Sequence, residues 1–247
     1  MNRAVHRRTR RDAAERGYTL IEIMIALSVG LFLVGGLLLV LQENRRTFGG
    51  QNALAQLQDG QRLAMTMIAD VIQSAGYFPD PTTSTQTTAL PSNVQFATAG
   101  QSIVGTENAA APGDTVTVRY VTASGDGVLN CSGTSNSSGA VQTYVNTFSV
   151  AGGQVVCAMN GTNYVLISGV TNLNVLYGVK TNFAIDNNNV DTYLNANQMT
   201  AANWGNVISV NVSLTFTNPL YAAGTAQPQT ILISRVIDLM NRIGVKI

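Results

Sequence analysis

The chain has 247 residues, only 11% of which are charged, and its formal net charge is +1; an average soluble domain has roughly 25% charged residues. The charge is unevenly spread, because residues 3–16 hold six of the 14 Lys and Arg residues and the chain from residue 18 onward has a net charge of −3. A general basic surface for binding nucleic acid is therefore not expected.

The residue inventory argues against the familiar kinds of enzyme. The only histidine is His6, inside the Arg-rich head, so the rest of the chain lacks the base that a Ser-His-Asp or Cys-His triad needs. Two cysteines, Cys131 and Cys157, cannot build a Cys-only zinc site. The sequence contains neither a Walker-A loop nor a G-x-G-x-x-G motif after a predicted strand, the two glycine-rich motifs that bind phosphate groups. We expect a non-enzymatic protein without a metal or cofactor.

An uncharged apolar segment covers residues 23–41. As a helix it would extend about 28 Å, close to the hydrocarbon thickness of a bilayer. It is longer than a secretory signal core, and no A-x-A cleavage site follows Leu41, so we expect it to stay in the mature protein. The arginines before it predict a single-pass anchor whose N-terminus is cytoplasmic, with the body on the other side of the membrane.

Glu22 directly precedes this apolar run, inside the wider stretch 18–41. A carboxylate at depth in a bilayer costs about 2.5–3.5 kcal/mol on insertion scales. Two interpretations follow: a carboxylate tolerated at the membrane boundary, or one that awaits a cation from another subunit. Four residues further, Ala26 and Gly30 form a small-xxx-small pair that permits close helix approach.

The segment Arg16-Gly17-Tyr18-Thr19-Leu20-Ile21-Glu22, followed by a long apolar helix, resembles the processing site of type IV prepilins and pseudopilins. The resemblance implies a leader at residues 1–17, cleavage by a prepilin peptidase between Gly17 and Tyr18, and N-methylation of Tyr18. The family usually has Phe where this chain has Tyr18. Glu22 becomes the fifth mature residue, and the new amine of one subunit can neutralise Glu22 of its neighbour during assembly.

The helix is expected to continue to residue 76, because no proline interrupts it. We divide it into a membrane and assembly half, residues 18–42, and an amphipathic half, residues 43–76. Apolar residues of the second half follow three- and four-residue spacing, with Gln61 interrupting: Leu54, Leu57, Ala64, Ile68, Val71 and Ala75. This pattern predicts packing onto a globular domain; an exposed interaction seam is the alternative.

Residues 77–247 are predicted to form a β-rich domain. Residues 77–81 stop the helix, and residues 82–114 are interpreted as a long surface loop. Alternation of apolar and polar residues predicts antiparallel strands, whereas 231–239 is ambiguous between an edge strand and a short helix. The predicted strands are 115–121, 141–150, 154–159, 164–168, 173–179 and 207–217. The fold class is α+β, one long helix packed on an antiparallel sheet domain.

A second resemblance narrows the choice of family. Residues 58–64 and 75–77, then 169–179, 191–193 and 204–210, resemble the PilW minor pilins. The resemblance implies a minor pilin that primes type IV pilus assembly and enters the fibre at or near its tip, supporting motility or adhesion. Implied partners are other minor pilins, the major pilin, an inner-membrane assembly platform and a tip adhesin. The implied location is the inner membrane, then the pilus at the cell surface.

Two other functions stay open. A J-type pseudopilin of type II secretion shares the processing site and the helix. A DNA-uptake competence pilin needs a basic groove flanked by aromatic residues, and the net charge of −3 from residue 18 onward argues against it.

Two smaller features carry predictions. Cys131 and Cys157 form an even pair in a chain expected to face an oxidising compartment, so we expect a disulfide, with two free buried thiols as the alternative. The run Asp186–Asp191 supplies closely spaced oxygen ligands that could hold Ca²⁺. It lacks the EF-hand pattern, and an Asn-rich turn is the preferred interpretation.

Overall fold

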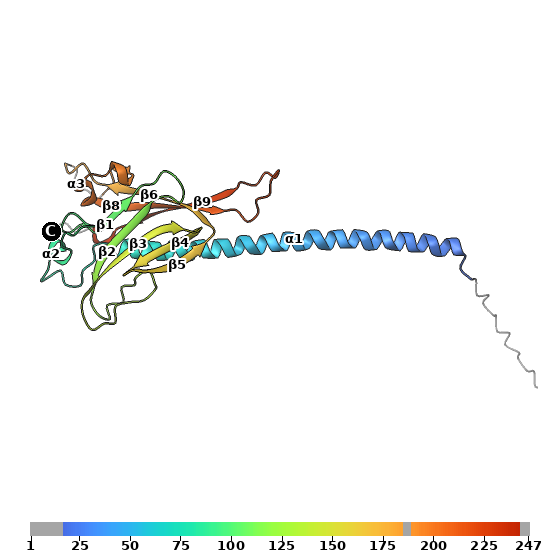
Figure 1. The fold of residues 1–247 in the computed structure, drawn as a ribbon, viewed down its shortest axis with the longest axis horizontal. Coiled ribbons are helices and arrows are strands. Elements are labelled where there is room, and N and C mark those ends of the chain that lie inside the picture. Colours follow the sequence, from blue (N-terminus) through green and yellow to red (C-terminus); the bar gives the residue numbers. More distant parts are fainter. Residues whose placement is uncertain (1–16, 185–188, 243–247) are drawn as a thin grey trace, which may run out of the picture. The chain divides into compact units, whose positions relative to one another are not determined.

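A computed structural model of the chain describes residues 17–184 and 189–242. The leader predicted at residues 1–17, apart from Gly17, lies outside the described residues, as do Asp186–Asn188. The chain divides into two compact units, one up to Gln51 and one from Asn52 onward, and each is described by itself (Figure 1).

Helix α1 covers Leu20–Gln73. The absence of proline allows 54 residues to continue without a break. The helix ends three residues before the predicted position, because Ser74–Gly76 form a turn in which Gly76 has a φ of 78°. A glycine in this left-handed region is a common helix stop. The Gly76 N–H then donates to the carbonyl of Arg119 at 3.0 Å, so the chain leaves the helix attached to the sheet.

The last part of α1 buries one face in the body. Its buried residues are Gln61, Ala64, Met65, Ile68, Ala69, Val71 and Ile72. Packing of the amphipathic half onto a domain, predicted from Ala64, Ile68 and Val71, is therefore confirmed. Gln61 does not interrupt this face: it is 6% exposed, and its amide nitrogen has no hydrogen-bond partner among the described residues.

The α+β class is confirmed, with two antiparallel sheets (Figure 1). The first has the order β1-β2-β3-β4-β5 and the second the order β7-β6-β8-β9. The strands of the first sheet are β1 (Ile103–Thr106), β2 (Thr115–Thr122), β3 (Gln142–Ala151), β4 (Gln154–Met159) and β5 (Thr162–Ser168). Those of the second are β6 (Val170–Val179), β7 (Thr192–Leu194), β8 (Val207–Thr217) and β9 (Thr230–Asp238).

The predicted alternation sets which strand face is buried. In β8, Val210, Val212 and Leu214 are fully buried and lie opposite Tyr177, Val175 and Leu173 of β6, one to one. Residues of α1 and of both sheets form one hydrophobic cluster. The ambiguous segment 231–239 is an edge strand, β9, and not a helix. Short helices complete the fold: α2 (Gln86–Ala89), η1 (Ala196–Gln198), α3 (Ala201–Trp204) and η2 (Met240–Arg242).

A buried carboxylate connects the two sheets. Asp114, which is 3% exposed, precedes β2. One of its oxygens accepts the N–H of Val175 in β6 at 2.7 Å, and the other accepts the N–H of Asn108 at 2.9 Å. Its own N–H donates to the carbonyl of Leu173 at 2.8 Å. Charge-assisted bonds of this kind are among the stronger protein hydrogen bonds.

The prediction of an irregular surface loop over residues 82–114 is wrong in part. This segment contains α2 and β1, and Leu90, Phe96 and Ile103 are fully buried. The reason lies outside the segment, in Arg119 of β2. Arg119 is 2% exposed, and the central carbon of its guanidinium lies 4.3 Å from the centre of the Phe96 ring, a cation–π distance.

Arg119 holds this segment through main-chain carbonyl groups. Its Nε donates to Gln101 at 2.6 Å and its Nη1 to Pro91 at 2.6 Å. Its Nη2 donates to Leu90 at 3.2 Å. The carbonyl groups of Pro91 and Gln101 would otherwise be left without partners, and that of Leu90 also accepts the N–H of Gly100 at 2.8 Å.

Replacing Arg119 by Met should lower the free energy of unfolding by about 2–4 kcal/mol, because three carbonyl groups lose a charged donor and the Phe96 ring loses its cation. Chemical denaturation measures this loss. The control is Arg235→Met, which removes an exposed arginine from β9 and should change stability by less than about 0.5 kcal/mol. Equal effects of the two substitutions would contradict the anchoring role of Arg119.

Candidate functional site

The predicted processing residues lie in an accessible segment before α1. Residues 17–19 have no regular secondary structure, and Tyr18 is 80% exposed. The carbonyl group of Thr19 accepts the N–H groups of Glu22 at 3.0 Å and Ile23 at 3.2 Å, which starts the helix. Glu22 therefore lies in the first turn, where the helix dipole favours a negative charge.

Four-residue spacing places Glu22, Ala26 and Gly30 on one face of α1, and Tyr18 precedes this face. A shallow hollow on this face is lined by Tyr18, Glu22, Ala26 and Gly30, together with apolar neighbours. A Cβ built on Gly30 would meet no atom within 4 Å, so the space above it is open. Among the described residues, the Glu22 carboxylate has neither a hydrogen-bond partner nor an ion-pair partner.

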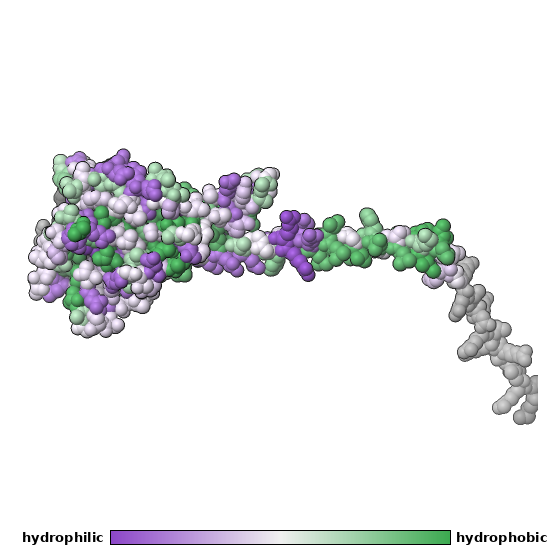
Figure 2. Space-filling view, viewed as in Figure 1, coloured by the Kyte–Doolittle hydropathy of each residue, from purple (hydrophilic) through white to green (hydrophobic). Residues whose placement is uncertain are grey.

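The surroundings of Glu22 are apolar and exposed. Within the part of the chain that the structure describes, α1 is the one helix long and apolar enough to cross a membrane, and none of its residues from Leu20 to Leu41 is buried. Figure 2 shows this stretch in green, followed by a purple polar band. Residues 42–46, Gln-Glu-Asn-Arg-Arg, supply the polar side chains after the apolar run.

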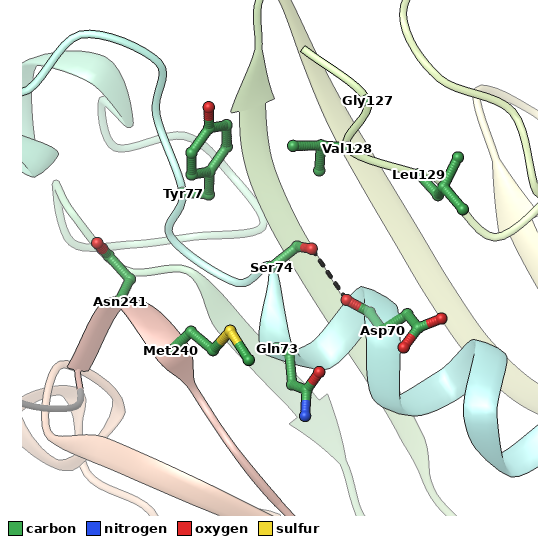
Figure 3. Close-up of a pocket in the computed structure, with 9 residues that line it drawn as sticks. All are labelled: Asp70, Gln73, Ser74, Tyr77, Gly127, Val128, Leu129, Met240 and Asn241. Carbon is green, nitrogen blue, oxygen red and sulfur yellow. Dashed lines mark hydrogen bonds between the residues drawn. The ribbon is translucent and has the colours of Figure 1, made fainter.

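The unit from Asn52 onward has a separate groove at the end of α1 (Figure 3). Its walls are the last turn of α1, the segment Gly127–Leu129 and the start of η2, and its volume is about 460 Å³. Leu129 and Met240 are exposed there, and the Ser74 hydroxyl donates to the Asp70 carbonyl at 2.9 Å. Burial, and to a lesser degree Asp126, raises the pKa of the Tyr77 hydroxyl. Among the residues that line this groove, Asp70 carries the single charged side chain.

The predicted disulfide is present between Cys131 and Cys157, and both residues are fully buried. It joins the segment between β2 and β3 to strand β4. Hydrogen bonds add to this attachment: the Tyr120 hydroxyl donates to the carbonyl of Leu129 at 2.8 Å, and the Cys131 N–H donates to the side-chain oxygen of Asn146 at 3.2 Å. The sequence predicts the cysteine pair, but it does not predict that the segment between β2 and β3 packs against the first sheet.

The candidate calcium run lies partly outside the described residues. Its last member, Asp191, accepts the N–H groups of Asn182 and Thr181, each at 2.7 Å. These two bonds lower the pKa of the Asp191 carboxyl group. The carboxylate therefore closes the base of a loop. Among residues 17–184 and 189–242, no group of three or more His, Cys, Asp or Glu side chains could hold a metal ion.

Two family models match the sequence. The model of the prokaryotic N-terminal methylation motif matches residues 12–38, which include Gly17, Tyr18 and Glu22. The model described as Type IV Pilus-assembly protein W matches residues 120–236, from β2 to β9. Both resemblances predicted from the sequence are thereby confirmed. No curated protein matches the chain.

Two solved structures are similar at low identity. One is a chain from the binary complex of two pseudopilins of the Vibrio vulnificus type 2 secretion system, with 12% identity and a TM-score of 0.42, covering 76% of this chain and 94% of that chain. The other is a type IV-like pilin from Thermus thermophilus, with 11% identity and a TM-score of 0.43, covering 75% of this chain and 97% of that chain.

Removing the disulfide with the pair Cys131→Ser and Cys157→Ser should lower the free energy of unfolding by about 3–4 kcal/mol, because the bond closes a long loop of the unfolded chain. Denaturant titration of the oxidised protein and the double variant measures the difference. The double variant should also be insensitive to added reductant. A stability equal to that of the oxidised protein would contradict this prediction.

Proposed function

We propose that this chain, with its PilW-type body and its prepilin-type N-terminus, is a minor pilin that primes assembly of a type IV pilus and enters the fibre at or near its tip. Its role is structural and not enzymatic. Helix α1 anchors the chain in the inner membrane with its N-terminus in the cytoplasm. After assembly the protein is part of the pilus at the cell surface, where it supports motility or adhesion.

The observation that carries this proposal is the Glu22 carboxylate at the head of an apolar helix, which has no partner among residues 17–184 and 189–242. An ionised carboxylate inside a bilayer costs about 2.5–3.5 kcal/mol on insertion scales unless a cation neutralises it. Cleavage after Gly17 supplies such a cation as the new amine of Tyr18. The open space above Ala26 and Gly30 lets a neighbouring helix approach Glu22 closely.

Pairing between subunits explains how a chain already in place directs the position of the next one. The amine of an incoming chain neutralises Glu22 of the chain already in place, and this ion pair sets the axial register of the two helices. In a medium of low dielectric constant the attraction is strong, although desolvation offsets part of it. The β-rich body supplies lateral contacts with other minor pilins and the major pilin, and the assembly platform and a tip adhesin are further partners.

Processing by a prepilin peptidase gives the first test. Intact-mass analysis of protein from the native membrane should show loss of residues 1–17, one added methyl group on Tyr18 and an oxidised Cys131–Cys157 pair. The accessible segment at residues 17–19 supports cleavage at this position. A mature protein that retains Met1, or that has lost the apolar helix to a signal peptidase, would contradict the proposal.

Replacing Glu22 by Gln tests assembly. The variant should still be processed and inserted in the membrane, but its incorporation into pili should fall by about tenfold or more, which corresponds to about 1.4 kcal/mol of lost pairing. Immunoblotting of sheared pili against membrane fractions measures incorporation. The matched control is Glu43→Gln, which removes an exposed carboxylate from the same helix beyond the apolar run and should be incorporated normally.

Deleting the gene for this chain distinguishes a role in the type IV pilus from a role in type II secretion. Loss of surface pili with normal type II secretion supports the minor pilin. Loss of secretion with normal pili would assign the chain to the J-type pseudopilins. Normal incorporation of the Glu22→Gln variant would overturn the templating mechanism in either machine.

A further inference from the structure

A polar hollow of about 620 Å³ lies between the first sheet and the disulfide-bonded segment 123–141. Its size is within the range of small-molecule sites, about 300–1,000 Å³. Residues Asn130 to Ser138 form one wall, and Gln142, Tyr144, Met159, Asn160 and Tyr164, from β3, β4, β5 and the β4–β5 turn, form the other. The hollow is separate from the Glu22 face and from the groove at the end of α1.

Tyr144 is the residue that points to a ligand. Its side chain is only 7% exposed, and its ring packs edge-on against Tyr120, with 5.9 Å between ring centres. Its hydroxyl forms no hydrogen bond with any residue that the structure describes, although it borders the hollow. The ring is therefore fixed by packing, while the hydroxyl opens onto the hollow and is available to a molecule that enters it.

The walls are held in place before any ligand arrives. Asn130 accepts N–H and hydroxyl groups from Ser132 and Thr134, and Asn136 donates to the carbonyl groups of Thr122 and Ala140. The Cys131–Cys157 bond fixes the segment between these two asparagines to β4. Hydroxyl or amide groups at Ser135, Gln142 and Tyr164 form no hydrogen bond with a described residue. They are free to bind.

The chemistry of the lining selects a class of ligand. None of the residues that line the hollow is charged, so nothing there compensates the desolvation of a charged ligand. Hydroxyl and amide groups both donate and accept, and they would lose water without replacement if an apolar ligand entered. The half-buried ring of Tyr164 adds apolar surface next to these polar groups. A neutral ligand with several hydroxyl groups and an apolar ring face meets all three conditions.

We infer that the hollow beneath the segment 123–141 binds a neutral saccharide, with the Tyr144 hydroxyl as one of its hydrogen-bond partners. An extended peptide fits less well, because peptides usually add to a free sheet edge through main-chain bonds, whereas side chains of a sheet face and a loop line this hollow. The inference does not depend on the proposed role in pilus assembly.

The test is calorimetric titration of the full chain with neutral oligosaccharides: lactose, N-acetyllactosamine and maltotriose. The charged comparison is sialyllactose, and an uncharged Gly-Ser-Asn peptide tests the other class of ligand. A polyoxyethylene detergent is required, because a maltoside headgroup is itself a saccharide. We expect at least one neutral saccharide to bind, and the charged one and the peptide not to bind.

Tyr144→Phe should weaken saccharide binding by about two- to tenfold, the equivalent of one hydrogen bond, while the ring contact with Tyr120 keeps the fold. Gln142→Ala, at an exposed position, gives a second reduction that cannot arise from unfolding. Tyr221→Phe removes an exposed hydroxyl elsewhere and should bind as the unchanged chain does. No binding of a neutral saccharide, preference for the charged probe or the peptide, or unchanged affinity in both hollow variants would overturn the inference.

Discussion

Burial of one face of α1 between residues 61 and 72 is the constraint on which the body depends. The helix and the two sheets bury their apolar faces together, because Ile68, Val71 and Ile72 are part of the same hydrophobic cluster as Val118 and Val212. The helix therefore acts as a layer of the core. The same helix exposes apolar side chains over residues 20–41, so its two halves meet different apolar environments.

Only 11% of the residues are charged, so the partners of each buried or membrane-facing ionised group indicate its role. Arg119 is satisfied by carbonyl groups of the segment 90–101, and Asp114 by two main-chain N–H groups. Both are partnered within the body, where an unpartnered charge would be costly. Glu22 differs, because its carboxylate has no partner among the described residues. That contrast supports a partner outside the chain for Glu22, and structural roles for the other two.

Sequence periodicity predicted the elements whose environment repeats along the chain. Strands β4 and β8 have the predicted bounds, because every second side chain of a half-buried strand faces the core. Residues 82–114 could not be predicted in this way, since Leu90, Phe96 and Ile103 follow no period and are ordered by a distant arginine. The Cys131–Cys157 disulfide could be predicted, because the chain has an even number of cysteines and is expected to face an oxidising compartment. The hollow at Tyr144 could not, because residues far apart in the sequence form it. Gln61 lies on the buried face although a polar residue in a helical stripe predicts an interruption.

The way in which Arg119 grips its segment has an evolutionary consequence. Every residue has the same main-chain carbonyl group. Because Arg119 donates its hydrogen bonds only to such groups, these bonds do not require a particular side chain at the positions that accept them. Between the anchored carbonyls, the residues at positions 92, 94 and 97 are exposed. Substitutions at these positions alter none of the Arg119 bonds, so the surface can diversify while the underlying scaffold stays constant.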